Sequence, residues 1–88
     1  MASYRLRLSD QAERVLARMA QREPVVFMRV VRALDELEQD PSLGKALVGK
    51  LRGRRSYRVG SYRIIYTVQR QQLLVLMIDI GHRRGIYR

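Results

Sequence analysis

The sequence predicts an α+β domain in which a two-helix hairpin packs on one face of a curved antiparallel β-sheet, preceded by an N-terminal strand. Apolar residues recur with a helical period up to about residue 40 and with a strand period from about residue 55 onward. The loops between the later strands are short, and short loops favour antiparallel pairing because parallel strands need long crossovers. With 88 residues, the chain is expected to form one domain, residues 1–88, with a modest core.

Residues 3–8 alternate aromatic or aliphatic side chains with arginines, which is typical of a half-buried strand. Ser9 or Asp10 is suited to cap a helix that follows this strand. Apolar residues spaced three and four apart then make one stripe of the expected first helix apolar: Ala12, Val15, Leu16, Met19 and Ala20.

A second helix is expected to begin at Pro24, because proline fits the first helical position, where its missing N–H has no partner to lose. Asp40-Pro41 should end this helix. We interpret Met28, like Met19, as core filler. The expected buried stripe consists of Phe27, Val30, Val31, Leu34 and Leu37. The break between the helices is short, so they should pack as an antiparallel pair.

The second half of the chain reads as a loop followed by strands. Residues 41–55 are rich in glycine, lysine and arginine, which is typical of a loop. Strands are expected at roughly 55–59, 62–68 and 73–80. The last of these is apolar on both faces, as a central strand would be. A final short strand is expected over 84–88.

The net charge of +10 is concentrated in the second half of the chain. In residues 1–40 arginines and acids balance, whereas residues 41–88 contain eleven basic residues and one acid, Asp79. Most of the basic residues are arginines, whose planar guanidinium matches phosphate bidentately. Such a field predicts a polyanionic partner, nucleic acid in the first place and an acidic protein in the second.

Gly60-Ser61 has the composition of a two-residue hairpin turn with glycine first. That turn would place Arg58 directly opposite Arg63 on one face of the strand pair. Like charges in this position destabilise by roughly a few tenths to 1 kcal/mol. The helices can cover only one face, so we expect both arginines on the open face, where a bound phosphate relieves their repulsion. The opposite set should face the helices: Tyr57, Val59, Tyr62, Ile64 and Tyr66.

The segments LVGKLRG, YRVGSYRIIY and IDIGHRRGIYR together resemble the RelE/ParE superfamily of toxins from type II toxin–antitoxin pairs. The resemblance covers nearly the whole chain and is strongest to the RelE branch. It implies a ribosome-dependent endoribonuclease that cuts mRNA in the ribosomal A site through attack of the 2′-hydroxyl, without metal or other cofactor. It also implies a cognate RelB-like antitoxin as a partner, besides the ribosome and mRNA.

Carried over by position, the phosphate-stabilising arginines of the family fall on Arg63 and Arg83, a basic residue on Arg58, and the C-terminal tyrosine on Tyr87. Some relatives have a second lysine where this chain has Gly60. Arginine is a poor general base, so His82 is our candidate acid or base, with Tyr87 as its rival. Ribosomal RNA should be gripped by a basic set: Lys45, Lys50, Arg52, Arg54, Arg55 and Arg84.

Two other functions stay open from the sequence. A ParE-like protein would share the fold and inhibit DNA gyrase by protein contacts, and a non-catalytic basic module would only bind RNA or protein. The chain has no cysteine, which excludes disulfides and thiolate metal sites. It has no signal-peptide pattern and no apolar stretch of about 20 residues. We therefore expect a cytoplasmic protein with no membrane partner.

Overall fold

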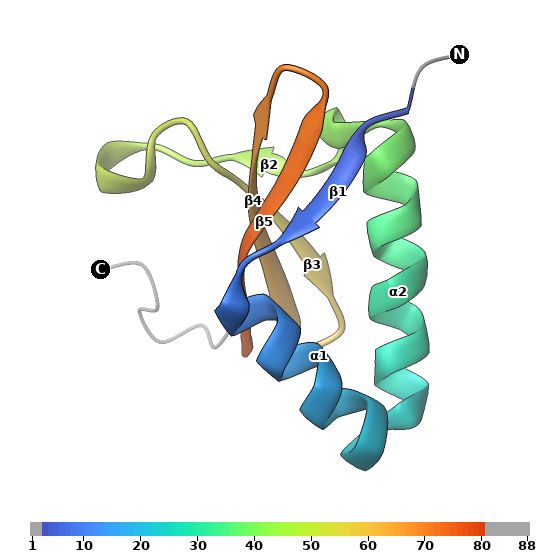
Figure 1. Cartoon of the computed structure of the whole chain (residues 1–88). Helices are drawn as coiled ribbons and strands as arrows, with labels where there is room; N and C mark the ends of the chain where they lie inside the picture. The colour runs from blue at the N-terminus through green and yellow to red at the C-terminus, as the bar shows by residue number, and fades with distance from the viewer. Residues whose placement is uncertain (1–2, 81–88) are drawn as a thin grey trace.

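The computed structural model describes residues 3–80, which form two helices packed on a five-stranded sheet (Figure 1). The elements are β1 (Arg5–Leu8), α1 (Asp10–Arg22), α2 (Pro24–Gln39), the 3₁₀ turn η1 (Pro41–Leu43), β2 (Lys45–Ala46), the 3₁₀ turn η2 (Gly49–Leu51), β3 (Arg55–Val59), β4 (Tyr62–Gln69) and β5 (Gln72–Ile80). The predicted α+β class, helices and strands are confirmed, and the predicted loop contains β2 and both 3₁₀ turns. The strand predicted over 84–88 lies outside the described residues.

The sheet has the order β1-β5-β4-β3-β2 and is mixed rather than wholly antiparallel. The pairs β2–β3, β3–β4 and β4–β5 are antiparallel, as the short loops predict, whereas β1 pairs with β5 in parallel. A parallel pair needs a long connection, and here both helices and three strands lie between β1 and β5 in the chain. The strand β5 is interior, between β1 and β4, as its two apolar faces predict.

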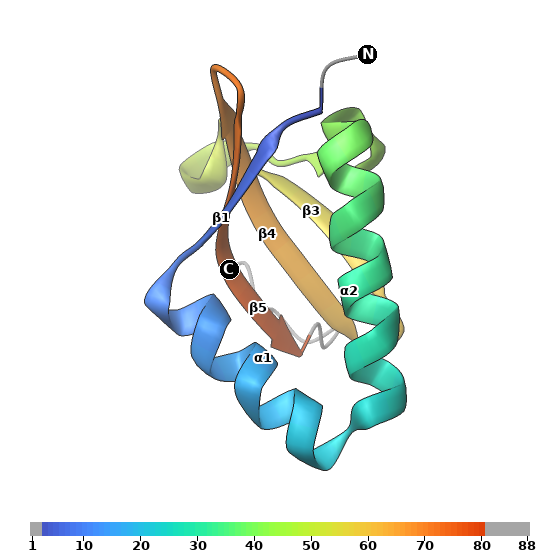
Figure 2. The same ribbon diagram turned by 45° about the vertical axis from the view of Figure 1, so that its right-hand side comes forward.

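Both helices lie on the same face of the sheet (Figure 2). The N-cap of α1 is Ser9, whose side chain accepts a hydrogen bond from the Ala12 backbone N–H at 3.1 Å. Pro24 begins α2, and Glu23 alone separates the two helices. In Figure 1, α1 runs down to this junction and α2 runs back up from it, and the two helices diverge with distance from the junction.

The core lies between the helices and the sheet. Its fully buried side chains include Met19, Val30 and Leu37 from the helices and Ile64, Tyr66, Leu73, Val75 and Ile78 from the sheet. The interpretation of Met28 as core filler is wrong, because this side chain is 59% exposed. At about 100° per residue, Met28 lies on the side of α2 opposite Leu37.

Tyr66 connects the core to the start of residues 41–55, which we call the basic loop. Its side chain is fully buried, and its hydroxyl accepts a hydrogen bond from the Gly44 N–H at 3.0 Å and donates one to the Pro41 carbonyl. Burial raises the pKa of Tyr66, so the phenol remains a donor at neutral pH. A Cβ at Gly44 would lie 2.3 Å from this hydroxyl, so the close approach requires glycine here.

Candidate functional site

The β3–β4 hairpin places two arginines opposite each other, as predicted. Val59 pairs with Tyr62 across the turn, Gly60 has a φ of 60°, and Arg58 pairs with Arg63. The Tyr62 hydroxyl donates a hydrogen bond to Glu23, at the junction of the two helices, at 2.7 Å. Neighbouring residues of a strand point to opposite faces. Arg63 and its partner Arg58 therefore lie on the face away from the helices.

A third charged residue extends this row onto β5. Asp79 pairs with Arg63, so Arg58, Arg63 and Asp79 occupy successive positions across three adjacent strands. Arg58 is exposed, and Arg63 and Asp79 are half-buried. We refer to these three residues as the charged row. The sequence showed that Asp79 is the one acid of the second half but not that it adjoins the arginines.

A β-bulge sets the register of the charged row. The pairing of β4 with β5 shifts between Ile65 and Tyr66 and skips Leu76. Without this extra residue, Arg63 would pair with Ile78, and Asp79 would move one position along the ladder. Bulges can re-aim a side chain in this way.

The start of α1 holds the bulged part of β5. The Ser9 hydroxyl donates to the Leu76 carbonyl at 2.7 Å, in addition to capping the helix. The Gln11 side-chain amide donates to the Ile78 carbonyl at 3.2 Å and accepts from the Ile78 N–H at 3.1 Å. Since β1 pairs with β5 only as far as Val75, these two side chains replace a neighbouring strand beyond that point.

Burial and the charge of Arg63 have opposite effects on the pKa of Asp79. Burial raises the pKa of its carboxyl, and the nearby Arg63 guanidinium partly offsets that effect. One carboxylate oxygen, Oδ1, is buried and has no hydrogen-bond partner within residues 3–80. A buried acceptor without a partner carries a desolvation cost of roughly 1–3 kcal/mol. Asp79 is therefore an acidic neighbour of Arg63 whose charged form is disfavoured by burial.

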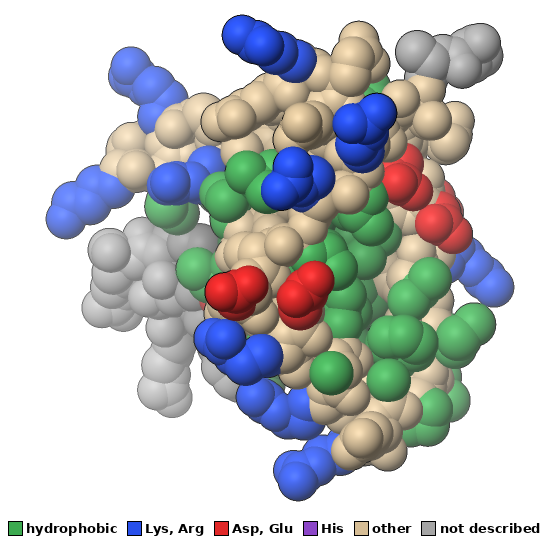
Figure 3. Space-filling view, viewed as in Figure 1, with side chains coloured by type: hydrophobic (Ala, Val, Ile, Leu, Met, Phe, Trp, Pro, Cys, Tyr) green, Lys and Arg blue, Asp and Glu red, His purple; other side chains and the backbone are tan. Residues whose placement is uncertain are grey.

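The basic loop presents most of its predicted contact residues to solvent. Lys45, Lys50, Arg52 and Arg54 are exposed, and Lys and Arg side chains project around this loop in the space-filling view (Figure 3). Arg55 differs, because it is half-buried and its Nη1 donates to the Gly44 carbonyl at 2.7 Å. This bond fixes the loop to β3 and gives Arg55 a structural role.

The remaining predicted site residues, His82, Arg83, Arg84 and Tyr87, lie outside the described residues. The last described residue of β5, Ile80, pairs with Tyr62 beside the β3–β4 turn. The segment GHRRGIYR follows Ile80 directly in the sequence.

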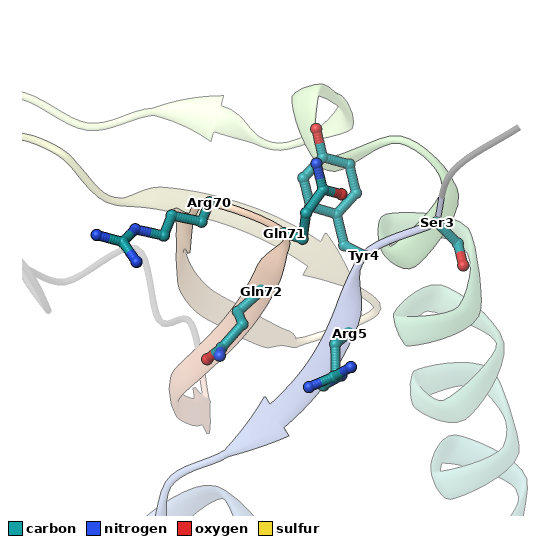
Figure 4. Close-up of a pocket in the computed structure, with 6 residues that line it drawn as sticks. All are labelled: Ser3, Tyr4, Arg5, Arg70, Gln71 and Gln72. Carbon is teal, nitrogen blue, oxygen red and sulfur yellow. The ribbon is translucent and has the colours of Figure 1, made fainter.

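Another cavity lies at the other end of the sheet, by the β4–β5 turn. It measures about 510 Å³ and is lined by Ser3, Tyr4, Arg5, Arg70, Gln71 and Gln72 (Figure 4). The Arg70 side chain points away from Arg5, so the two guanidiniums do not converge. This cavity is therefore no part of the candidate site.

Two further features concern the described residues alone. Between residues 3 and 80, no group of three or more His, Cys, Asp or Glu side chains is arranged to hold a metal ion. Neither of the helices in that range is long and apolar enough to cross a membrane.

Comparison with known proteins identifies the family. Residues 6–87 match the family described as the ParE toxin of the type II toxin–antitoxin system parDE. The chain is 32% identical to toxin RelG of Mycobacterium tuberculosis, over 97% of each protein. The chain thus belongs to the RelE/ParE superfamily of toxins from type II toxin–antitoxin systems.

Solved structures support the same fold. The toxin–antitoxin complex RelBE2 from Mycobacterium tuberculosis contains a chain that superimposes with a TM-score of 0.76 at 29% identity, covering 90% of this chain and 99% of that one. The YoeB/ParE toxin from Agrobacterium tumefaciens superimposes with a TM-score of 0.81 at 16% identity, covering 89% and 99%. At that identity the second likeness shows the fold alone.

Proposed function

We propose that this toxin is a ribosome-dependent endoribonuclease that cuts mRNA in the ribosomal A site and so inhibits translation. The observation that carries the proposal is the pairing of Arg58 with Arg63 on the sheet face that the helices leave uncovered. The repulsion between two guanidiniums in this position is relieved when a phosphate binds between them. The similarity to RelG supports the RelE branch.

The proposed reaction is an internal transesterification. The 2′-oxygen attacks the adjacent phosphorus, the bond to the 5′-oxygen breaks, and a 2′,3′-cyclic phosphate and a 5′-hydroxyl result. Arg58, Arg63 and Arg83 would stabilise the negative charge on the non-bridging oxygens. One such preorganised donor is worth about 3–4 kcal/mol of transition-state stabilisation.

Two protons must move in this reaction. One leaves the 2′-hydroxyl, and another is delivered to the 5′-oxygen. Arginine does not exchange protons near neutral pH, so we assign His82 as acid or base, with Tyr87 as the alternative. Neither assignment uses a metal or another cofactor.

The proposal includes a role for the ribosome in positioning the message. Holding the 2′-hydroxyl in line with the phosphate can contribute several kcal/mol, roughly 7–11 in the best intramolecular cases. The exposed basic residues of the loop, together with Arg84, would bind ribosomal RNA through its backbone, with a steep dependence on salt. The isolated toxin should accordingly be a weak nuclease on free RNA.

A cognate RelB-like antitoxin is the proposed protein partner. The similar RelBE2 structure is a toxin–antitoxin complex. This chain also exposes large apolar side chains that a partner could cover, among them Val25 at 74% and Met28 at 59% on α2. Co-expression of the neighbouring open reading frame should restore growth and yield a co-purifying pair. A chain that is harmless when expressed alone would contradict the toxin assignment.

Inhibition of DNA gyrase is the second candidate function, because the matching family is described as ParE. Primer extension on a translated message, with and without ribosomes, separates the two. Codon-positioned cuts that need ribosomes support mRNA cleavage. Double-strand breaks trapped on gyrase, without such cuts, support ParE-like action, and the absence of both supports a non-catalytic binding module.

A further inference from the structure

A second group of arginines lies in a groove between α2 and β3. The groove has a volume of about 220 Å³ and is lined by Arg29 and Arg32 from α2 and by Arg58 from β3, among others. Arg58 also belongs to the charged row, so the groove adjoins the candidate site. The groove could not be predicted from the sequence, because the charges of residues 1–40 balance. The sequence also does not show which arginines of α2 lie next to β3.

The cations of this groove are poorly neutralised. Within residues 3–80, none of the guanidiniums of Arg29, Arg32 and Arg58 has a hydrogen bond or an ion pair. The one acid among the described residues that line the groove, Glu36, accepts a hydrogen bond from the Tyr57 hydroxyl at 3.3 Å. Among the described residues, Arg29 and Arg32 from α2, with Arg58 on the adjoining edge strand β3, outnumber this one acid, so the groove has a local positive field that attracts an anion.

The backbone beside the groove is also accessible. In the described chain, β2 pairs with β3 only at Arg55 and Ser56, so no strand covers the outer edge of β3 next to Arg58. Gly60 has no side chain, and the place where its Cβ would be is 3.5 Å from Arg29 Nη1. The Arg29 guanidinium therefore lies against the turn, near the end of the charged row.

We propose that this groove binds a backbone phosphate of the RNA strand, next to the phosphate held by Arg58 and Arg63. This inference rests on the proposed RNA substrate. An RNA backbone presents successive phosphates, and Arg58 belongs both to the lining of the groove and to the charged row, so one strand can occupy both sites. The groove volume of about 220 Å³ suits a phosphate with its sugar better than a folded protein segment. An acidic peptide is the competing ligand, and binding measurements with RNA and with an oligoglutamate peptide distinguish the two.

Salt dependence gives the most specific test. Each phosphate neutralised on single-stranded RNA adds about 0.7 to the slope of log affinity against log salt concentration. Arg29→Ala and Arg32→Ala should each weaken binding several-fold at low salt and reduce that slope by up to about 0.7. Arg29→Lys keeps the charge and should preserve most of the slope.

The probe is a short RNA with 2′-O-methyl groups at every position, which prevents 2′-hydroxyl attack, and the readout is fluorescence anisotropy from 50 to 200 mM salt. Arg14→Ala, which removes an exposed arginine from α1, is the control for net charge. Thermal melting confirms that each variant is folded. The inference is overturned if Arg29→Ala and Arg32→Ala match the Arg14→Ala slope, or if they lose only the binding of an oligoglutamate peptide.

The same variants keep this inference distinct from the proposed function. If the wild-type protein cuts translated mRNA but the slopes do not change, the groove inference fails and the proposed function stands. If the slopes change as expected but no cut appears with ribosomes, the groove binds RNA and the proposed cleavage fails.

Discussion

Arg63 faces Asp79 across β4 and β5 because β5 contains one residue, Leu76, that has no partner in β4. In a regular ladder Arg63 would face Ile78. Asp79 would then lie opposite Tyr62, whose hydroxyl is bonded to Glu23. The bulge therefore gives the arginine of the proposed active site its acidic neighbour.

Ser9 should affect the charged row although it does not contact it. Ser9→Ala removes both the helix cap and the bond to Leu76, and we expect a loss of about 1–2 kcal/mol in the free energy of unfolding. Ser9→Asp keeps an N-cap acceptor but cannot donate to the Leu76 carbonyl. Because the cap is retained, any loss of mRNA cleavage in Ser9→Asp reports on the bulge. Urea denaturation and cleavage rates check both variants, and a fully active, fully stable Ser9→Asp would show that this bond does not matter.

Asp79 should make stability depend on pH. Its pKa is raised in the fold mainly by burial, above the ordinary value of about 3.9. The folded protein therefore holds this proton more tightly than the unfolded chain. The resulting stabilisation is fully present below about pH 3.9 and is lost as pH rises through the folded-state pKa.

Asn does not titrate. The free energy of unfolding of Asp79→Asn, relative to that of the wild type, should therefore increase when the pH is raised from 3.5 to 7. Urea denaturation at both values measures the change, and Asp35→Asn, at an exposed position of α2, controls for net charge. A relative loss of stability at pH 7 would mean that attraction to Arg63 outweighs burial.

The same substitution separates binding from catalysis. If Asp79 orients Arg63, Asp79→Asn should slow cleavage in single-turnover experiments while the affinity for 2′-O-methyl RNA is unchanged or higher. The affinity should not fall, because the substitution removes a negative charge beside the RNA-binding arginines. A lower affinity at an unchanged cleavage rate would refute the orienting role.

Tyr66→Phe should be costly because its hydroxyl bonds both Gly44 and Pro41 inside the protein. Leaving these backbone groups without partners should reduce the free energy of unfolding by about 1–3 kcal/mol. Tyr62→Phe removes one exposed bond, to Glu23, and should cost less. Chemical denaturation compares the two variants, and equal losses would contradict the assigned role of Tyr66.

Local patterns made most of the fold predictable. The helix boundaries followed from Ser9, Pro24 and Pro41, whose effects act within a few residues. The pairing of Arg58 with Arg63 was predictable because a two-residue turn fixes the register of its hairpin.

Features that depend on distant contacts were not predictable in the same way. The bulge at Leu76 is held by Ser9 and Gln11, which lie more than sixty residues earlier, so no local signal marks it. Because the bulge could not be predicted, the pairing of Asp79 with Arg63 could not be predicted either. The parallel pairing of β1 also depends on the assembled sheet, and Arg55 differs from its basic neighbours only through its bond to Gly44.

The most direct test of the central claim is the cleavage rate of Arg63→Ala on ribosomes that carry a defined message. If Arg63 stabilises the charge of the transferring phosphate, its loss should lower the rate by about 10²–10³-fold. Arg70→Ala, which removes an exposed arginine at the far β4–β5 turn, should cut at the wild-type rate. Cleavage by Arg63→Ala at the wild-type rate would contradict the account.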